Sequence, residues 1–310
     1  MKAEGLRRPA ISGKDAFVRG SKGDLMYYGL LAFTVCLFGA AFAINQQYQQ
    51  RMGSGFFEAF FFSALSACGG VCILFPINGF RLEFTPFTLI LALVNAAVSI
   101  SYTFCGLKAL GKINLSMYSM FAMLGGMLIP GLAGVFFYDE VMTVGKAVCY
   151  VIITAALLIP VEWKGGRGGH LFYVGVFVLN GISALLAKVY QAAPYEKASA
   201  SGYSLLASIC TLIIAGTMAA ILYPAHGKKL KLLPAAIGIS HGLINRVANW
   251  LLVITLVGIP ASVQFPIVTG GVMVVSTVVS CFSAKKPTKR QFAALGVSLF
   301  GIILITLVPN

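Results

Sequence analysis

The sequence predicts an all-α membrane protein with ten transmembrane helices, arranged as two inverted five-helix repeats. The first observation is composition: of 310 residues, 58% are hydrophobic and only 10% are charged, against about 25% charged residues in a typical soluble domain. The second is that the apolar residues gather into runs of about 20, the length that a helix needs to cross a bilayer. The third is that the second half of the chain resembles the first at a fixed offset.

Ten apolar runs are separated by short breaks that are polar or contain Gly and Pro, as loops are. Because the bilayer offers the backbone no hydrogen-bond partners, each run is expected to form a helix. The runs are Leu25–Ile44, Phe56–Ile77, Phe87–Leu107, Leu115–Tyr138, Val144–Val161, Leu171–Ala192, Tyr203–Tyr223, Leu233–Val257, Ala261–Phe282 and Phe292–Leu307. The turn between the fourth and fifth runs is marked only by Asp139, Glu140 and Thr143. We expect Glu140 to hold this turn near a helix N-terminus, where a carboxylate gains about 0.3–1 kcal/mol.

A shift of 145 positions aligns the third to fifth runs with the eighth to tenth, without gaps across two loops. Five runs per half is an odd number, so the second half must enter the membrane from the opposite side, as in many secondary transporters. The predicted organisation is a disordered basic tail over 1–24, a first repeat over 25–161 and a second over 171–308. The aligned pairs, expected to let helices pack closely, are Gly125 and Gly126 with Gly270 and Gly271.

The segment Gly106–Ile159 carries a recognisable order of features. It has Ala109-Leu110, small residues at Asn114–Ser116, then Pro130, and Asp139-Glu140 with Thr143 before an apolar run. This order resembles the EamA-type repeat of the drug/metabolite transporter superfamily, and the resemblance extends over both repeats. The resemblance implies ten helices, a central cavity between two bundles and alternating access.

The first run adds to this resemblance, since Phe38-Gly39 with Phe42 is similar to the aromatic-glycine pattern of the family's first helix. Two positions depart from the pattern. Lys285 stands in the second half where the first has Glu140, and Gln46 stands where the family often has a basic residue. These departures speak against borrowing a substrate from a relative.

The acidic residues all lie in tails, loops or the ends of runs. They are Glu4, Asp15, Asp24, Glu58, Glu83, Asp139, Glu140, Glu162 and Glu196. Without paired carboxylates or another acid, base, nucleophile and metal set, we expect no enzyme. The cysteines lack nearby histidines at metal-ligand spacing, so no metal and no cofactor are expected. The basic residues are scattered without a basic face, which argues against nucleic acid as a partner.

The charges inside the apolar runs are cationic. Arg246 lies near the middle of the eighth run, where a charge costs about 2.5–3.5 kcal/mol on insertion scales, so it is expected to face a wet cavity or a partner. His241, Asn245 and Asn249 follow one another at four-residue spacing and therefore share the helix face beside it. The competing interpretations are interhelical hydrogen bonds for the asparagines and an ion pair for Arg246, with Glu58 as the nearest plausible partner.

Further polar residues inside the runs are expected to bind substrate with Arg246. They are Asn95 and Ser99 in the third run, Asn180 and Lys188 in the sixth and Gln264 at the start of the ninth. Donors and cations with little negative charge suit a carboxylate or a phosphate.

The predicted function is therefore secondary transport of a small polar or anionic metabolite, such as an amino acid or organic acid, by alternating access. The resemblance to the drug/metabolite transporter superfamily favours export. The alternatives are a carrier of amphiphilic drugs or lipid-linked sugars, and, from another class, a channel or a membrane-embedded enzyme. The expected partners are a small-molecule substrate and the lipid bilayer, with a homodimer left open. The expected location is the plasma or inner membrane of the cell, as a multi-pass protein with both termini cytoplasmic.

Overall fold

The computed structural model describes residues 13–137, 143–159, 170–227, 232–255, 259, 261–283 and 285–307, without the side chains of 13–24, 146, 157–158, 170, 261–263 and 305–307. All regular structure in these residues is helical. The helices are α1 (Gly13–Met52), α2 (Phe56–Ile77), α3 (Pro86–Lys112), α4 (Leu115–Phe137), α5 (Val144–Leu158), α6 (His170–Ala192), α7 (Ala200–His226), α8 (Leu232–Thr255), α9 (Ala261–Cys281) and α10 (Lys289–Leu307). They coincide with the ten apolar runs, which confirms the all-helical fold.

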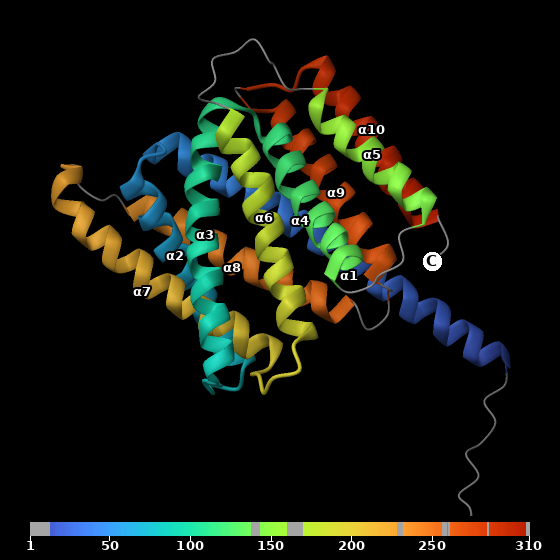
Figure 1. Ribbon diagram of the computed structural model, residues 1–310, viewed down its shortest axis with the longest axis horizontal. Coiled ribbons are helices and arrows are strands. Elements are labelled where there is room, and N and C mark those ends of the chain that lie inside the picture. The colour runs from blue at the N-terminus through green and yellow to red at the C-terminus, as the bar shows by residue number, and fades with distance from the viewer. Residues whose placement is uncertain are drawn as a thin grey trace, which may run out of the picture.

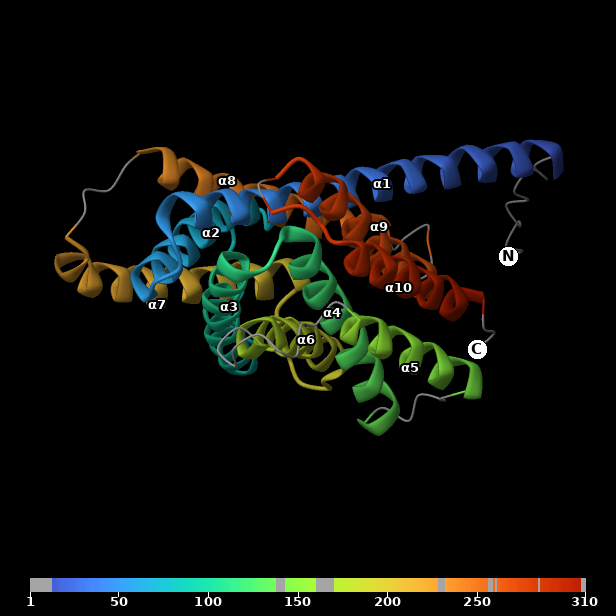
Figure 2. The same cartoon turned by 90° about the horizontal axis from the view of Figure 1, so that it is seen from above.

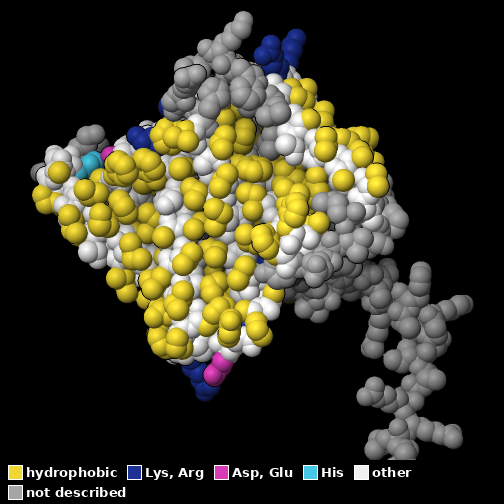
Figure 3. Space-filling model, in the orientation of Figure 1, with side chains coloured by type: hydrophobic (Ala, Val, Ile, Leu, Met, Phe, Trp, Pro, Cys, Tyr) yellow, Lys and Arg dark blue, Asp and Glu magenta, His cyan; other side chains and the backbone are white. Residues whose placement is uncertain are grey.

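The described helices have the composition of a multi-pass membrane protein. Eight of them, all except α5 and α10, are long and apolar enough to cross a membrane. Large apolar side chains are exposed along these helices, such as Ile90 at 61% and Ile213 at 62%, and hydrophobic side chains cover the middle of the molecule (Figure 3). Soluble proteins rarely expose such a surface, whereas lipid solvates it. With 15 residues, α5 reaches about 22 Å, short of the ~30 Å bilayer core, so the ten-span count stays a prediction.

Two helices extend well beyond their apolar runs. α1 continues through a polar segment to Met52 and ends at Gly53, whose φ of +99° is accessible mainly to glycine. α1 also begins at Gly13, within the segment predicted as a disordered tail, while residues 1–12 lie outside the described part. α3 similarly runs on to Lys112. The length of an apolar run matches the thickness of the bilayer core. A helix can continue beyond that run until a capping residue or a turn ends its backbone hydrogen bonding.

The two halves of the sequence interlock in space. α1 packs against α8 and α9, and α2 packs against α8, while α3 packs against α6 and α7, and α4 packs against α6. Two groups of four helices result, α1/α2/α8/α9 and α3/α4/α6/α7, which meet along α2–α7 and α4–α9. α5 and α10 pair at one edge (Figures 1 and 2). Each group takes two helices from each half, so residues 25–161 and 171–308 are not separate packing units.

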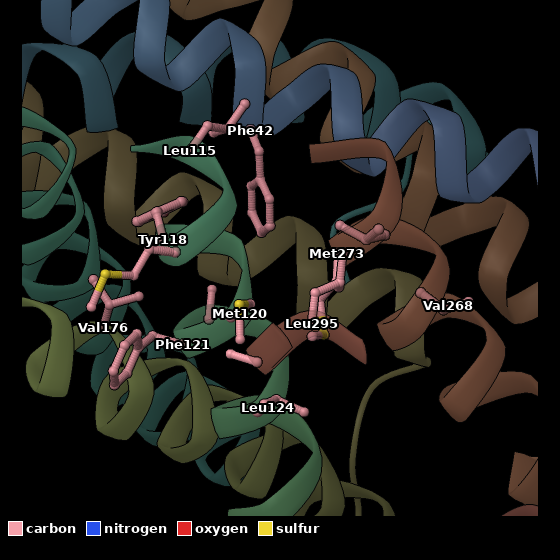
Figure 4. Packing of buried hydrophobic residues seen from close by; sticks show 14 of the residues in the cluster. Phe42, Leu115, Tyr118, Met120, Phe121, Leu124, Val176, Val268, Met273 and Leu295 are labelled. Atoms are coloured by element: carbon pink, nitrogen blue, oxygen red, sulfur yellow. The ribbon is translucent and has the colours of Figure 1, made fainter. Parts of the chain in front are cut away.

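The largest apolar core lies where α1, α4, α6, α9 and α10 converge. Phe42 of α1, Met120 and Leu124 of α4, and Met273 of α9 are buried there (Figure 4). Around it, the Tyr118 hydroxyl donates to the Tyr102 hydroxyl at 2.9 Å and accepts from Asn45 Nδ2 at 3.3 Å, linking α1, α3 and α4. This core fixes the two four-helix groups against each other on one side of the molecule.

At the end of the bundle where α3 stops and α4 starts, Asn114 and Lys285 tie this corner to the one between α9 and α10. Asn114 Oδ1 accepts from the Met117 amide at 3.0 Å, which caps α4, while its Nδ2 donates to Gln291 Oε1 at 2.6 Å. Lys285 Nζ donates to the carbonyl oxygens of Leu110 at 3.3 Å and Gly111 at 2.5 Å. A cation is favoured at a helix C-terminus because the last carbonyls lack helical partners. This gives Lys285 a structural role, and Glu140, its counterpart in the first half, lies outside the described residues.

At the opposite end, Glu83 ties the α2–α3 loop to the start of α7. Its carboxylate accepts from the Ser199 amide, and the Ser199 hydroxyl accepts from the Gly202 amide at 3.0 Å as the N-cap of α7. Asn78 Oδ1 accepts from Ser201 Oγ at 2.8 Å beside them. The Ser199 amide, and then its hydroxyl, hold the pKa of Glu83 below its usual value.

Glu83→Gln is therefore expected to lower the unfolding temperature of the detergent-solubilised protein slightly at neutral pH. Glu83 is half-buried and its hydrogen bond to Ser199 is exposed to solvent, and a carboxylate at such a helix N-terminus contributes about 0.3–1 kcal/mol. Because the folded pKa is lowered, this contribution is complete above the unfolded pKa near 4.3 and is lost as the pH falls through the folded pKa. The difference in unfolding temperature between wild type and variant should thus shrink on acidification. A difference of the same size at pH 7 and about pH 3 contradicts this assignment.

Candidate functional site

Arg246 lies where α2, α7 and α8 meet. A Cβ atom built on Gly70 of α2 would be 3.2 Å from Arg246 Nε and 3.4 Å from Ser208 Oγ of α7. The missing side chain at Gly70 thus lets the arginine cross the face of α2 and reach α7. Ser208 is buried and donates its hydroxyl proton to the Ser204 carbonyl at 2.8 Å, which leaves its oxygen able to accept. Arg246 itself is half-buried.

The predicted alternative partner of Arg246, Glu58, is engaged elsewhere. Glu58 Oε1 lies 3.7 Å from His226 Nδ1, at the first turn of α2 and the last turn of α7. Gly70 is twelve residues further along α2, which corresponds to about 18 Å of helix. Among the described residues no carboxylate pairs with Arg246. The idea of a Glu58–Arg246 ion pair is therefore wrong.

α2 and α8 cross with almost no space between their backbones. A Cβ atom on Gly242 would overlap the Ser66 carbonyl oxygen, and one on Gly69 would overlap the Ile239 carbonyl oxygen. His241 Nδ1 lies 2.9 Å from Ser66 Oγ, and its ring lies 4.8 Å from that of Phe62. His241 is thus held by α2 one turn before Arg246, and the crossing fixes where Arg246 leaves its helix.

Asn245 and Asn249 bind each other along α8. Asn249 Nδ2 donates to the Asn245 carbonyl at 2.7 Å and to Asn245 Oδ1 at 3.1 Å. Asn245 is half-buried and Asn249 is exposed. The pair places a polar surface beside Arg246, but both of these hydrogen bonds of Asn249 are made within α8.

The polar residues of α3 and α6 form a separate group. Ser183 Oγ donates to Asn95 Oδ1 at 3.1 Å, which joins the two helices. Ser99, one turn further along α3, is half-buried, and its carbonyl oxygen accepts from Thr103 Oγ1 at 3.0 Å. Asn95, predicted as a substrate-binding residue, therefore makes an interhelical hydrogen bond.

Asn180 and Lys188 of α6 turn toward α4. Asn180 Nδ2 donates to the Ala122 carbonyl at 2.6 Å, and Lys188 Nζ donates to the Pro130 carbonyl at 3.4 Å. These contacts lie between α4 and α6, whereas the contacts of Arg246 lie between α2, α7 and α8. The two predicted cations thus belong to different helix groups.

Gln264 and Thr143 occupy helix ends. Gln264 is fully buried and its Nε2 donates to the Leu252 carbonyl at 2.7 Å, which ties the start of α9 to α8. The Thr143 carbonyl accepts from the Ala147 amide at 3.0 Å as the first hydrogen bond of α5. Both contacts are structural.

The paired glycines all sit at close helix contacts. A Cβ atom on Gly125 would overlap the Phe177 carbonyl oxygen of α6, and one on Gly126 would lie 2.7 Å from Asn180 Nδ2. A Cβ atom on Gly270 would lie 2.9 Å from Leu299 Cδ2, and one on Gly271 would lie 2.8 Å from Val35 Cγ1. α4 is therefore held against α6, and α9 against α10 and α1.

Sequence reasoning missed the contribution of α7 to the surroundings of Arg246. Tyr203 is only 7% exposed and lies within electrostatic range of the guanidinium. Ser208 approaches it over Gly70. The signal available in the sequence was the polar spacing of Ser204, Ser208 and Thr211, which fits one helix face.

Two further features of the described residues bear on function: possible metal ligands and an apolar groove. The described residues contain no group of three His, Cys, Asp or Glu side chains placed to hold a metal ion. An apolar groove of about 230 Å³ runs between α9 and α10, lined by Pro266, Ile267, Gly270, Gly271, Val274, Leu299, Ile302 and Ile303. It bears no charged side chain, so it suits an acyl chain better than a polar solute.

Comparison with known proteins identifies a shared fold. No protein-family model matches the chain. No curated protein sequence matches it either. Solved structures do match in shape, 27 chains in all; one is a crystal structure described only as that of a protein, similar with a TM-score of 0.56 and 15% identity over 90% of this chain and 96% of that one. A likeness at this identity establishes the fold alone.

Proposed function

We propose that this protein is a secondary transporter that moves a small anionic metabolite, such as an amino acid or an organic acid, by alternating access. The observation that carries the proposal is Arg246: a permanent cation in the middle of a membrane helix, with no carboxylate paired to it among the described residues. The two residues that approach its side chain, Gly70 and Ser208, carry no charge. A cation at this depth in a membrane helix needs a counter-charge, and a substrate carboxylate or phosphate supplies it through the planar fork of the guanidinium.

The helix pairings support the inverted-repeat part of the proposal. In two five-helix repeats, α1 to α5 correspond in order to α6 to α10. The α1–α8 contact then corresponds to α6–α3, the α1–α9 contact to α6–α4, and the α2–α8 contact to α7–α3. The contacts α2–α7, α4–α9 and α5–α10 each map onto themselves. All of these pairs occur, as expected if the two halves are related by a two-fold axis in the membrane plane.

The two four-helix groups suit alternating access. Arg246 and Gly70 belong to α1/α2/α8/α9, whereas Ser208 and Tyr203 belong to α3/α4/α6/α7. A substrate held by Arg246 would thus lie at the boundary of two bodies that rock against each other. The remaining accessible surface of Arg246 is proposed to face a water-filled cavity at this boundary.

Transport by the full chain in proteoliposomes tests this function. The panel pairs each acid with a neutral relative: L-glutamate with L-glutamine, and glycerol 3-phosphate with glycerol. We expect counterflow of at least one acid and not of its neutral relative. Uptake of a lipophilic cation such as tetraphenylphosphonium, with none of the acids, would overturn the proposal in favour of the amphiphilic-drug carrier, and unitary current steps in a planar bilayer would favour a channel.

A further inference from the structure

Three aromatic rings from three helices form a platform at one end of the bundle. Phe56 at the start of α2 stacks on Phe104 in the last part of α3, with ring centroids 4.5 Å apart and planes at 7°. Phe172 at the start of α6 lies edge to face with Phe104, with centroids 6.1 Å apart. α3 ends and α6 begins at the same end of the bundle (Figure 1). Phe56 is 63% exposed, so this aromatic platform reaches the surface of the protein.

Two lysines of α3 lie over the aromatic platform. Lys108 Nζ is 5.7 Å from the centroid of the Phe104 ring, and Lys112 Nζ is 5.3 Å from the centroid of the Phe172 ring. Phe104, Lys108 and Lys112 follow one another at four-residue spacing and therefore share one face of α3. Lys112 is exposed and Lys108 is half-buried. Because each ammonium group is attracted by the ring beneath it, two positive charges are held side by side above an apolar surface.

The platform and its lysines lie at the boundary between the hydrocarbon core and the headgroups. Lys108 directly follows Phe87–Leu107, the apolar run of α3, which is about 30 Å long as a helix and so matches the hydrocarbon core. Phe56 and Phe172 lie at the beginning of the apolar runs of α2 and α6. A lysine at such a position keeps its stem on apolar surface and extends its charge into the interface. The rings therefore face acyl chains, and the ammonium groups face headgroups.

The charges of the neighbouring described residues favour an anion at this place. Lys285 donates to the last carbonyls of α3, which offsets the negative end of the helix dipole. Among the described carboxylates, only Glu58 lies at this end of the bundle; its side chain is 12% exposed and lies 3.7 Å from His226. Lys108 makes no ion pair with any described residue. Its charge is thus available to a ligand.

We propose that Lys108, Lys112 and the aromatic platform form a binding site for an anionic phospholipid such as phosphatidylglycerol. The two ammonium groups bind the headgroup phosphate, and Phe56 supports the upper part of an acyl chain. A zwitterionic phospholipid carries its own cation beside the phosphate and gains less from two lysines. Since α2 belongs to one four-helix group and α3 and α6 to the other, the lipid would contact both groups. This inference does not depend on what the protein transports.

Thermal unfolding of the full chain in mixed micelles of dodecyl maltoside and phospholipid tests the site. Dioleoyl phosphatidylglycerol should raise the unfolding temperature more than dioleoyl phosphatidylcholine, and the difference should shrink as the salt concentration rises. In Lys108→Gln/Lys112→Gln, the half-saturating mole fraction of phosphatidylglycerol should rise roughly 10- to 30-fold, because each lysine near an anionic headgroup contributes about a factor of five. Lys108→Arg/Lys112→Arg keeps both charges and should behave like the wild type.

Lys289→Gln/Arg290→Gln is the matched control. It removes the same charge at the same end of the bundle, from two exposed residues at the start of α10 that lie over no described aromatic ring. The half-saturating mole fraction of phosphatidylglycerol should stay close to that of the wild type. An equal loss of affinity in both glutamine double variants would mean that the lipid responds to overall charge, and would overturn the site.

Lys108→Gln alone is the milder variant and guards against a folding defect. Without lipid it should unfold at the wild-type temperature, while the half-saturating mole fraction rises about five-fold. Equal stabilisation of the wild type by phosphatidylglycerol and phosphatidylcholine would overturn the proposal. Stabilisation by inorganic phosphate that is lost in the glutamine variants would also overturn it, because the lysines would then bind a soluble anion instead of a lipid.

Discussion

Replacement of Arg246 by leucine is expected to abolish transport of the acidic substrate while the protein still folds. Two charge-assisted hydrogen bonds from the guanidinium, each worth about 1.5–3 kcal/mol, would be lost, which lowers affinity at least roughly 100-fold. Leucine is favoured at this depth, whereas arginine costs about 2.5–3.5 kcal/mol on insertion scales. The leucine variant should therefore insert and unfold normally while counterflow in proteoliposomes disappears.

Arg246→Lys is the companion variant. Lysine keeps the positive charge but loses the planar fork that grips a carboxylate or phosphate at two oxygens. We expect impaired transport with a raised KM and an unfolding temperature close to that of the wild type. Together the two variants separate the contribution of charge from that of geometry.

A structural role for Arg246 makes the opposite prediction. Removing one member of a buried ion pair typically costs 3–5 kcal/mol, so Arg246→Leu would then be poorly folded, and neutralising the partner would restore it. Glu58→Gln provides this check, because Glu58 was the acidic residue that the sequence suggested and the structure places beside His226. Rescue of Arg246→Leu by Glu58→Gln would contradict the transport role.

Gly242→Ala is expected to damage the fold itself. The added methyl group would overlap the Ser66 carbonyl oxygen, and since that atom is backbone, α2 and α8 must move apart. Overpacking costs about 1–3 kcal/mol or more, which exceeds the gain of about 1 kcal/mol from replacing glycine by alanine in a helix. We expect a markedly lower unfolding temperature and a lower yield of monodisperse protein in size-exclusion chromatography.

Gly216→Ala is the matched control for this prediction. It makes the same chemical change inside α7, where a Cβ atom would have nothing within 4 Å. It should leave the unfolding temperature unchanged or raise it slightly. If both alanine variants unfold at the wild-type temperature, the close crossing of α2 and α8 does not contribute to stability as predicted.

The helices were predictable because hydropathy is a local property. Each of the ten apolar runs corresponds to one helix, and α2 begins at Phe56 and ends at Ile77 as predicted. Differences arise at the ends, where capping decides the boundary: Gly53 ends α1, and Thr85 with Pro86 starts α3. Bilayer thickness sets the length of an apolar run, whereas backbone hydrogen bonding and capping set the ends of the helix.

The candidate site was predictable only in part. The depth of Arg246 and the spacing of His241 and Asn245 follow from the period of a single helix, so the sequence indicates that α8 has a polar face. Whether Asn95 or Asn180 bonds a neighbouring helix or faces a cavity depends on the helix beside it. Their bonds to Ser183 and to the Ala122 carbonyl became visible only in the packed structure.

By itself, the sequence determined that this is a multi-helix membrane protein whose mid-membrane charge is positive, because composition and periodicity act within one segment at a time. Only the tertiary structure decided that Glu58 lies against His226, that α1, α2, α8 and α9 form one group, and that Ser208 of α7 approaches Arg246 over Gly70. These facts depend on which backbones can approach, and glycines such as Gly70 and Gly242 allow that approach where α2 meets α8. A glycine in the sequence does not indicate which helix packs against it. The pairing of the helices, and with it the candidate site, is therefore seen only in the tertiary structure.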